Sequence, residues 1–265
     1  MFTWYGGKHY ITPWILENFP KSHTYGAYVE AYGGSGKTLL RKSPSQVEVF
    51  NELNSNVVNV WRVAQERGAE LVRELWKIPE GRNSFERYRD AGVNCEPLKN
   101  AVREIVIRQM SFNGCQKHFS PDHVKPGKWK RNANGWMNLI CRYRDEYIPR
   151  IQGVKIHNED ALNVMRQYDS DNTLLYLDPP YVHESRTISH RDDYEFEYSD
   201  ADHIRMCETI RELKGYVCLS GYRNWIYDYY LKDWRTVDKE FKNRAGQWAD
   251  GAVSTRRTET LWMNY

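Results

Sequence analysis

The feature that most constrains the fold of this chain is a short apolar run that ends in a stiff polar turn. Residues 174–177 (Leu-Leu-Tyr-Leu) are followed directly by Asp178-Pro179-Pro180-Tyr181. A continuous apolar run bounded by turn-forming residues is typical of a strand that is buried on both faces. Such strands occur in parallel sheets that carry helices on both sides. The sequence therefore places Asp178 at the carboxyl end of a buried strand.

The rest of the chain repeats this pattern of strand, turn and helix. Residues 56–65 have a helical pattern, and Ser199 with Asp202 has the spacing of a capping box, which predicts a helix through Glu212. Alternating strands and helices indicate a parallel sheet. We expect an α/β fold with a Rossmann-like, mostly parallel seven-stranded sheet and helices on both faces. The expected strands are 27–30, 46–50, 154–157, 174–177, 216–219, 235–239 and 258–262.

The sequence pattern changes between residues 66 and 150. Residues 71–77 and 98–110 read as helices, and residues 111–136 read as an irregular, basic segment punctuated by glycine. A long stretch without strands inside an α/β sheet indicates an inserted lobe. We therefore predict a catalytic domain made of residues 1–65 and 151–265, with a mainly helical target-recognition domain at 66–150.

Composition narrows the class of protein only slightly. The 265 residues carry a formal net charge of +3, so any affinity for nucleic acid has to come from local clusters of charge. The five cysteines form no Cys-x-x-Cys pair, which argues against a disulfide framework and against a zinc site. We find no signal segment and no membrane-length apolar run. We expect a soluble cytoplasmic protein without a metal.

The tetrapeptide suits a site that holds a flat, amino-bearing base. An exocyclic amine on adenine or cytosine is a poor nucleophile, because its lone pair is conjugated into the ring. If the Asp178 carboxylate and the Pro179 carbonyl hold its two hydrogens, the nitrogen can aim its lone pair at an electrophile. Pro179 and Pro180 stiffen the turn, since proline fixes φ. Tyr181 offers a ring for stacking.

A glycine-rich turn follows the first expected strand. It runs from Glu30 to Gly36, and glycines there let a ligand approach the main chain closely. Residues 31–38 also nearly match the phosphate-binding pattern of P-loop ATPases, which makes a nucleotide hydrolase the main alternative. Glu30 argues against it, because a carboxylate would repel a triphosphate but would suit an ammonium group. A ligand with adenosine and an amino-acid tail fits better, and S-adenosylmethionine is such a ligand.

The ordered motifs resemble those of the Dam-type adenine-N6 DNA methyltransferases over the whole length of the chain. Residues 4–8 (Trp-Tyr-Gly-Gly-Lys) resemble the family's amino-terminal motif, residues 30–36 its cofactor loop and residues 51–54 its ribose-binding turn. Asp178-Pro179-Pro180-Tyr181 is similar to its catalytic signature. The resemblance implies a catalytic role for that tetrapeptide and contact with S-adenosylmethionine for Trp4, Lys8, Glu30, Tyr32, Gly34, Gly36, Glu52, Asp160 and Asp178.

The resemblance also implies double-stranded DNA as substrate, with the target base rotated out of the helix. Residues 108–119 are similar to the start of the family's DNA-reading lobe, and the following basic segment interleaves cations with aromatic rings. A cognate restriction endonuclease, a prokaryotic or viral source and a monomer or weak dimer fit this family. The expected DNA-binding residues are Arg108, Asn113, Lys117, Lys128, Lys130 and Arg131.

The residues alone leave other functions open. An Asp-Pro-Pro-Tyr pocket grips planar amines in general, so cytosine N4 or an amide in RNA or protein is a possible acceptor. The P-loop-like turn keeps an ATPase in play, and a catalytically silent DNA-binding protein could share the fold. We note that Ala31, Tyr32 and Glu52 differ from the residues usual in the family, and that Lys37 is unexpected in the loop.

Overall fold

The structure, a computed structural model, describes residues 1–265 apart from 5–6, 9, 121–134, 183–197 and 243–255. The chain forms two compact units, which we name the helical unit and the sheet unit. The helical unit comprises Met1–Tyr10, Gly34–Arg41 and Asn54–Asn158, and the sheet unit comprises Ile11–Gly33, Lys42–Leu53 and Glu159–Tyr265. These units differ in their bounds from the domains expected from sequence, and that expectation stays a prediction.

The strands form a seven-stranded sheet in the order β3-β2-β1-β4-β5-β7-β6. β1 pairs in parallel with β2 and β4, and β4 pairs in parallel with β5, whereas β7 is antiparallel to β5 and β6. The expected mostly parallel sheet is thus confirmed. The strands are β1 Ala27–Glu30, β2 Val47–Asn51, β3 Lys155–His157, β4 Thr173–Leu177, β5 Tyr216–Gly221, β6 Arg235–Lys242 and β7 Arg256–Met263.

The order of the strands reverses between β1 and β4. The chain runs outward from β1 to β2 in one direction and from β4 to β5 in the other. In register, Glu30 lies opposite Tyr176, so both strands end at the same edge of the sheet. Ligands of open α/β sheets bind at the carboxyl ends of the strands, at such a switch point. The glycine-rich turn after β1 and the turn at residues 178–181 after β4 therefore leave the sheet side by side.

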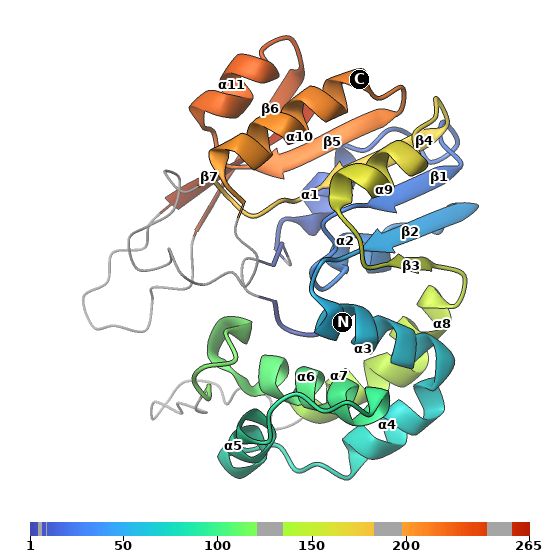
Figure 1. The fold of residues 1–265 in the computed structure, drawn as a ribbon, viewed down its shortest axis with the longest axis vertical. Helices are drawn as coiled ribbons and strands as arrows, with labels where there is room; N and C mark the ends of the chain where they lie inside the picture. Colours follow the sequence, from blue (N-terminus) through green and yellow to red (C-terminus); the bar gives the residue numbers. More distant parts are fainter. Residues whose placement is uncertain (5–6, 9, 121–134, 183–197, 243–255) are drawn as a thin grey trace. The chain divides into compact units, whose positions relative to one another are not determined.

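Helices cover both faces of this sheet. The helices α9 (Ala161–Gln167), α10 (Asp200–Glu212) and α11 (Trp225–Tyr230) pack on one face, where their apolar side chains share a core with β1, β4 and β5 (Figure 1). On the other face, Phe19 packs against Tyr28 and Tyr176 just after α1 (Thr12–Glu17). All five residues of β4 are buried, as its apolar run predicts.

The expected start of α10 is confirmed by its cap. The Ser199 side chain accepts from the Asp202 amide, and the Asp202 carboxylate accepts from the Ser199 amide. This reciprocal capping box satisfies two amide donors that a helix start otherwise leaves without partners.

The helical unit is built around α6, which packs against α3 and α5. The helices predicted at 56–65, 71–77 and 98–110 are confirmed, with ends that differ by one to a few residues. The expected irregular segment 111–136 contains a short 3-10 turn, η1, and the start of α7. The elements are α2 Lys37–Arg41, α3 Ser55–Glu66, α4 Gly68–Trp76, α5 Arg82–Asp90, α6 Pro97–Met110, η1 Phe112–Gly114, α7 Gly135–Arg142, the π-helical turn η2 Tyr143–Tyr147 and α8 Ile148–Ile151.

Within the described part of the chain, every helix is too short or too polar to cross a membrane.

Candidate active site

The Asp-Pro-Pro-Tyr turn leaves the carboxyl end of the buried strand β4. Leu177 is fully buried, Asp178 and Tyr181 are half-buried, and Pro179 is buried between them. The side chains of Asp178 and Tyr181 therefore stand at the transition from core to surface. A carboxylate in this position can contact a ligand while two prolines limit the motion of the main chain.

The Tyr181 ring is held by Tyr222, which directly follows β5, and by Glu259 of β7. It stacks on Tyr222 with ring centroids 4.3 Å apart and an interplanar angle of 16°. Its hydroxyl donates a hydrogen bond of 3.3 Å to Oε2 of Glu259. Tyr222 covers one face of the ring, so a planar ligand would stack on the other face.

Glu30 lies at the end of β1, where the glycine-rich turn begins. Its side chain is buried, at 3% exposure, and Oε2 accepts a 3.0 Å hydrogen bond from the Tyr28 hydroxyl. Burial and the neighbouring Glu30 carboxylate raise the pKa of Tyr28 well above its usual value, so Tyr28 stays a donor. Glu30 thus places a buried carboxyl group, held by a hydrogen bond, at the switch point, where it suits an ammonium group.

The turn after Glu30 requires glycine because it approaches β2 closely. The Gly33 amide donates to the Asn51 carbonyl at 2.8 Å, and a Cβ at Gly33 would lie 2.2 Å from the Phe50 ring. Any larger residue would push the turn away from the end of β2. The glycine motif therefore encodes close packing of the main chain as well as access for a ligand.

Asn51 joins three chain segments at this edge of the sheet. Its side-chain amide donates to the Ala31 carbonyl at 2.9 Å and to the Glu159 carbonyl at 3.1 Å, and its oxygen accepts from the Glu159 amide. Asp160 follows directly and caps α9 by accepting from the Leu162 amide at 2.8 Å. Asn51 thereby fixes Asp160 relative to the glycine-rich turn.

Tyr32 forms a wall beside Asp160. Its hydroxyl shares a 2.8 Å hydrogen bond with Tyr198, and the two rings meet edge to face. The pKa of Tyr32 is raised well above its usual value by burial first and then by Tyr198, with a smaller contribution from Asp160. The structure therefore brings the predicted residues Tyr32 and Asp160 together. Glu52 is half-buried at the turn after β2.

Gly34 and Trp4, both predicted to contact the cofactor, lie against each other in the helical unit. Gly34 has a φ of 50°, and a Cβ there would lie 2.9 Å from Nε1 of Trp4, so this position favours glycine. Lys8 is buried. Trp4 in turn packs under Arg108, whose guanidinium carbon lies 4.4 Å from the centre of the Trp4 ring. The amino-terminal motif is thus fixed against the second half of the glycine-rich turn.

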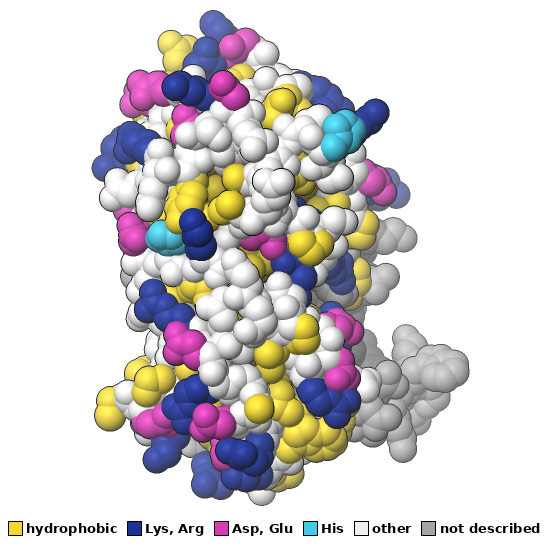
Figure 2. Space-filling view, turned by 90° about the vertical axis from the view of Figure 1, so that its right-hand side faces the viewer, with side chains coloured by type: hydrophobic (Ala, Val, Ile, Leu, Met, Phe, Trp, Pro, Cys, Tyr) yellow, Lys and Arg dark blue, Asp and Glu magenta, His cyan; other side chains and the backbone are white. Residues whose placement is uncertain are grey.

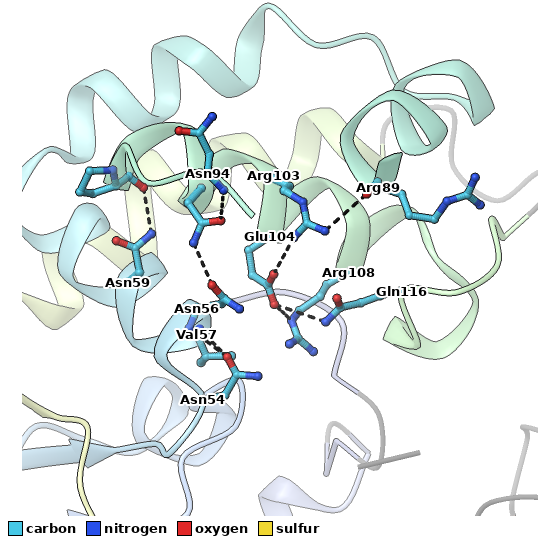
Figure 3. A network of polar contacts seen from close by, with 12 residues as sticks. Asn54, Asn56, Val57, Asn59, Arg89, Asn94, Arg103, Glu104, Arg108 and Gln116 are labelled. Atoms are coloured by element: carbon cyan, nitrogen blue, oxygen red, sulfur yellow. Dashed lines mark hydrogen bonds and ion pairs between the residues drawn. The ribbon is translucent and has the colours of Figure 1, made fainter. Parts of the chain in front are cut away.

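Arg108 lies in a buried polar network (Figure 3). It forms an ion pair with Glu104, one turn earlier on α6, and the two residues are 6% and 1% exposed. The side-chain amide of Gln116 lies beside the Arg108 guanidinium, from which its oxygen accepts hydrogen bonds. Gln116 has a φ of 61°, which is uncommon for a residue other than glycine. The network therefore holds the turn after α6 in an unusual backbone conformation.

The other expected DNA-binding residues fall into two groups. Asn113 lies in η1 and Lys117 is exposed shortly after it. Lys128, Lys130 and Arg131 lie outside the described residues. On the face shown in Figure 2, basic and acidic side chains of the described residues are interspersed. The assignment of DNA contacts stays a prediction.

The described residues contain no group of three or more histidine, cysteine or acidic side chains placed to hold a metal. What the sheet edge does offer is a fixed carboxylate at the end of β1, a half-buried carboxylate at the end of β4, and a stacked aromatic ring. These are groups that bind an ammonium, an amine and a planar base.

Sequence reasoning did not assign four residues that support this edge. The sequence predicts a turn at Asn51 and a strand at Glu259, and it assigns no contact to either of them or to Tyr222. Their partners lie far away in sequence, so only the fold reveals them. The sequence contains no signal for Glu259, because residues 256–260 are polar throughout. The fourth is Tyr198.

Comparisons with known proteins show the family to which the chain belongs. The family model for D12 class N6 adenine-specific DNA methyltransferases matches residues 4–253. The type II methyltransferase M1.LlaDCHI of Lactococcus lactis subsp. cremoris is 26% identical over 278 residues, which cover 99% of this chain and 94% of that protein.

The type II methyltransferase M.MjaIII of Methanocaldococcus jannaschii is 23% identical over 239 residues, covering 79% of this chain and 78% of its own. A family match of this extent decides between methyl transfer and nucleotide hydrolysis. The chain therefore belongs to the D12 class N6 adenine-specific DNA methyltransferases, and its reaction is site-specific methylation of adenine N6 in DNA.

Proposed function

We propose that S-adenosylmethionine is the methyl donor and that the edge formed by β1 and β4 is where donor and adenine meet. The observation that carries this proposal is the parallel register of the two strands, which ends both at one edge of the sheet. The glycine-rich turn after β1 and the Asp178 turn after β4 then face a shared ligand region, as the switch-point rule predicts.

The residues of the sheet unit fit the donor chemically. The buried carboxylate of Glu30 suits the ammonium of the methionine part, and Glu52 suits ribose hydroxyls. Tyr32, beside Asp160, offers an aromatic wall for the adenine of the donor. When bound, S-adenosylmethionine supplies a methyl group on a positively charged sulfur, so no metal is required. The roles of Trp4, Lys8, Gly34 and Gly36 stay predictions from the resemblance.

Asp178 has the central role in this mechanism. Its carboxylate accepts a hydrogen bond from one N–H of adenine N6, and the Pro179 carbonyl accepts a hydrogen bond from the other N–H. The nitrogen lone pair then points out of the base plane, toward the methyl group. Tyr181 holds the plane of the base by stacking. Holding reactants in near-attack geometry can lower a barrier by about 7–11 kcal/mol, so placement alone accounts for a large part of the rate.

A base inside a duplex cannot reach such an edge. We infer that the target adenine rotates out of the helix, which costs a few kcal/mol of stacking and pairing. Contacts to the phosphates of the flanking duplex can offset that cost. The basic residues expected at 117–131 are the candidates for these contacts.

The test is the variant Asp178→Ala. We expect it to bind S-adenosylmethionine and DNA but to transfer methyl groups at least a hundredfold more slowly, because the amine is no longer oriented. Transfer is measured with a radiolabelled donor and unmethylated plasmid DNA.

The matched control is Asp171→Ala, an exposed aspartate just before β4 at its opposite end. We expect that control to keep the full rate. A rate for Asp178→Ala equal to that of the control would refute the proposal.

A further inference from the structure

Glu259 is a fully buried carboxylate in the strand β7, at 0% exposure. A buried charge is costly unless its oxygens accept hydrogen bonds. Here Oε1 accepts from the Ser220 hydroxyl at 2.7 Å, and Oε2 accepts from the Tyr181 hydroxyl at 3.3 Å. The carboxylate therefore bridges β5 and the catalytic turn.

A second residue of β7, Arg257, contacts Tyr222, the other tyrosine of the stack. Arg257 lies two residues before Glu259, and side chains two apart in a strand point to the same face. Its guanidinium donates to the Tyr222 hydroxyl at 3.3 Å and lies 5.4 Å from the centre of the Tyr222 ring. Neighbouring side chains of β7 thus contact Tyr181 and Tyr222, which stack on each other.

This arrangement defines the plane of the Tyr181 ring. Stacking on Tyr222 limits tilting of the ring, and the bond from its hydroxyl to Glu259 limits sliding. A hydrogen bond to a charged acceptor is about twice as strong as one between neutral groups. An apolar side chain in place of Glu259 would remove the carboxylate that accepts this hydrogen bond from the tyrosine hydroxyl.

We propose that Glu259 is a positioning residue for methyl transfer, which acts through the Tyr181 hydroxyl to align the ring on which the target adenine stacks. This inference rests on the proposed function, in which Tyr181 contacts the base. Arg257 has the corresponding role for Tyr222. The carboxylate does not touch the reacting atoms, so its effect depends on the tyrosine hydroxyl.

The experiment is a double-mutant cycle with Glu259→Ala and Tyr181→Phe. We measure kcat, the KM for S-adenosylmethionine and the melting temperature, using unmethylated plasmid DNA. Each single variant is expected to lower kcat roughly tenfold, the factor that loss of one charge-assisted hydrogen bond gives. The KM for the donor is expected to stay unchanged. In the Tyr181→Phe background, Glu259→Ala is expected to change kcat less than about twofold, because the hydroxyl it acts through is gone.

Two further variants separate positioning from stability. Glu259→Gln keeps an acceptor of the same shape and is expected to restore most of kcat. If Glu259→Ala does not fold, Glu259→Leu takes its place in the cycle, because leucine fills the buried space but accepts no hydrogen bond. Glu240→Ala removes an exposed carboxylate of the adjacent strand β6, which pairs with Arg256, and is expected to keep the full kcat.

The outcomes distinguish this inference from the proposed function. If Glu259→Ala lowers kcat by the same factor with and without the Tyr181 hydroxyl, or if Tyr181→Phe keeps the full kcat, the positioning role is wrong. The proposed function survives that result as long as Asp178→Ala and Tyr181→Ala are inactive. If those two variants retain the wild-type rate, the proposed function itself fails.

Discussion

Individual buried charges in this enzyme are paired in two different ways. Lys42 and Glu48 pair at 2.7 Å at the start of β2, where the ammonium also lies over the Tyr28 ring. Glu104 and Arg108 pair within one helix, and the guanidinium lies over Trp4. Removal of one partner from a buried pair leaves a charge that neither water nor an opposite charge stabilises. The pair of Glu104 and Arg108 therefore affects both the stability of the protein and the packing of Trp4 in the amino-terminal motif.

We expect Glu104→Gln to destabilise the protein by about 3 kcal/mol, since it removes the negative charge that faces the buried Arg108. Urea unfolding followed by tryptophan fluorescence measures this. The control is Glu74→Gln, which removes an exposed partner of Lys77 and is expected to change stability little. Equal unfolding midpoints for the two variants would contradict the structural role of the Glu104–Arg108 pair.

At the scale of one element, α2 begins with an unfavourable residue. Lys37 is its first residue, and a cation at a helix start opposes the helix dipole. Burial lowers the pKa of Lys37 to about 8, with smaller contributions from Arg41 and Arg142. The family resemblance did not explain a lysine in this loop. The structure shows that its charge is costly in the folded state.

The sign of the pH dependence follows from this lowered pKa. Below pH 8 the lysine is protonated in both the folded and the unfolded state, and the cost of the charge is fully present. Between pH 8 and its ordinary pKa of 10.5, the unfolded state binds more protons, so stability rises with pH. Lys37→Met should therefore raise the melting temperature at pH 7, and by less at pH 9.5. The same gain at both pH values would contradict a buried ammonium, and Lys99→Met, which alters an exposed lysine of α6, is the control.

For the molecule as a whole, affinity for DNA cannot come from total charge. The net charge is only +3, and the face in Figure 2 mixes both signs. Binding to a polyanion then depends on where a few cations lie. Each phosphate contact lowers the logarithm of the binding constant by about 0.9 per tenfold increase in salt.

The triple variant Lys128→Glu, Lys130→Glu, Arg131→Glu tests this at molecular scale. We expect weaker DNA binding and a salt slope that falls by about 0.9 for each lost phosphate contact, measured by fluorescence anisotropy at several salt concentrations. Its control reverses three exposed lysines elsewhere, Lys99, Lys214 and Lys232, with the same change in net charge. If both triple variants show the same slope, these three residues do not contact DNA.

Much of this enzyme could be predicted from its sequence, because its motifs are local. The sheet, the capping box of α10 and the family follow from periodicity, turn residues and short patterns, and all are confirmed. The supporting contacts could not be predicted. The bonds of Asn51 to Glu159, of Tyr32 to Tyr198 and of Tyr181 to Glu259 join residues 78 to 166 positions apart, and only strand order brings them together.

Arg108 is a residue whose burial could not be predicted from the sequence. Its type and the resemblance of residues 108–119 to the family's DNA-reading lobe favour a contact with DNA, whereas in the fold it is buried against Trp4 and a glutamate four residues earlier. An i, i+4 pair of opposite charges is usually a solvated surface feature. Sequence shows the pairing but not the depth at which it occurs.

The position of β7 between β5 and β6 has a consequence for how the enzyme becomes active during folding. The parallel strands β1, β4 and β5 can align without β7, but Tyr181 gains its carboxylate partner only when β7 pairs with β5. A chain in which β7 has not paired with β5 therefore lacks the hydrogen bond from Tyr181 to Glu259, and the ring of the catalytic turn is left without this support.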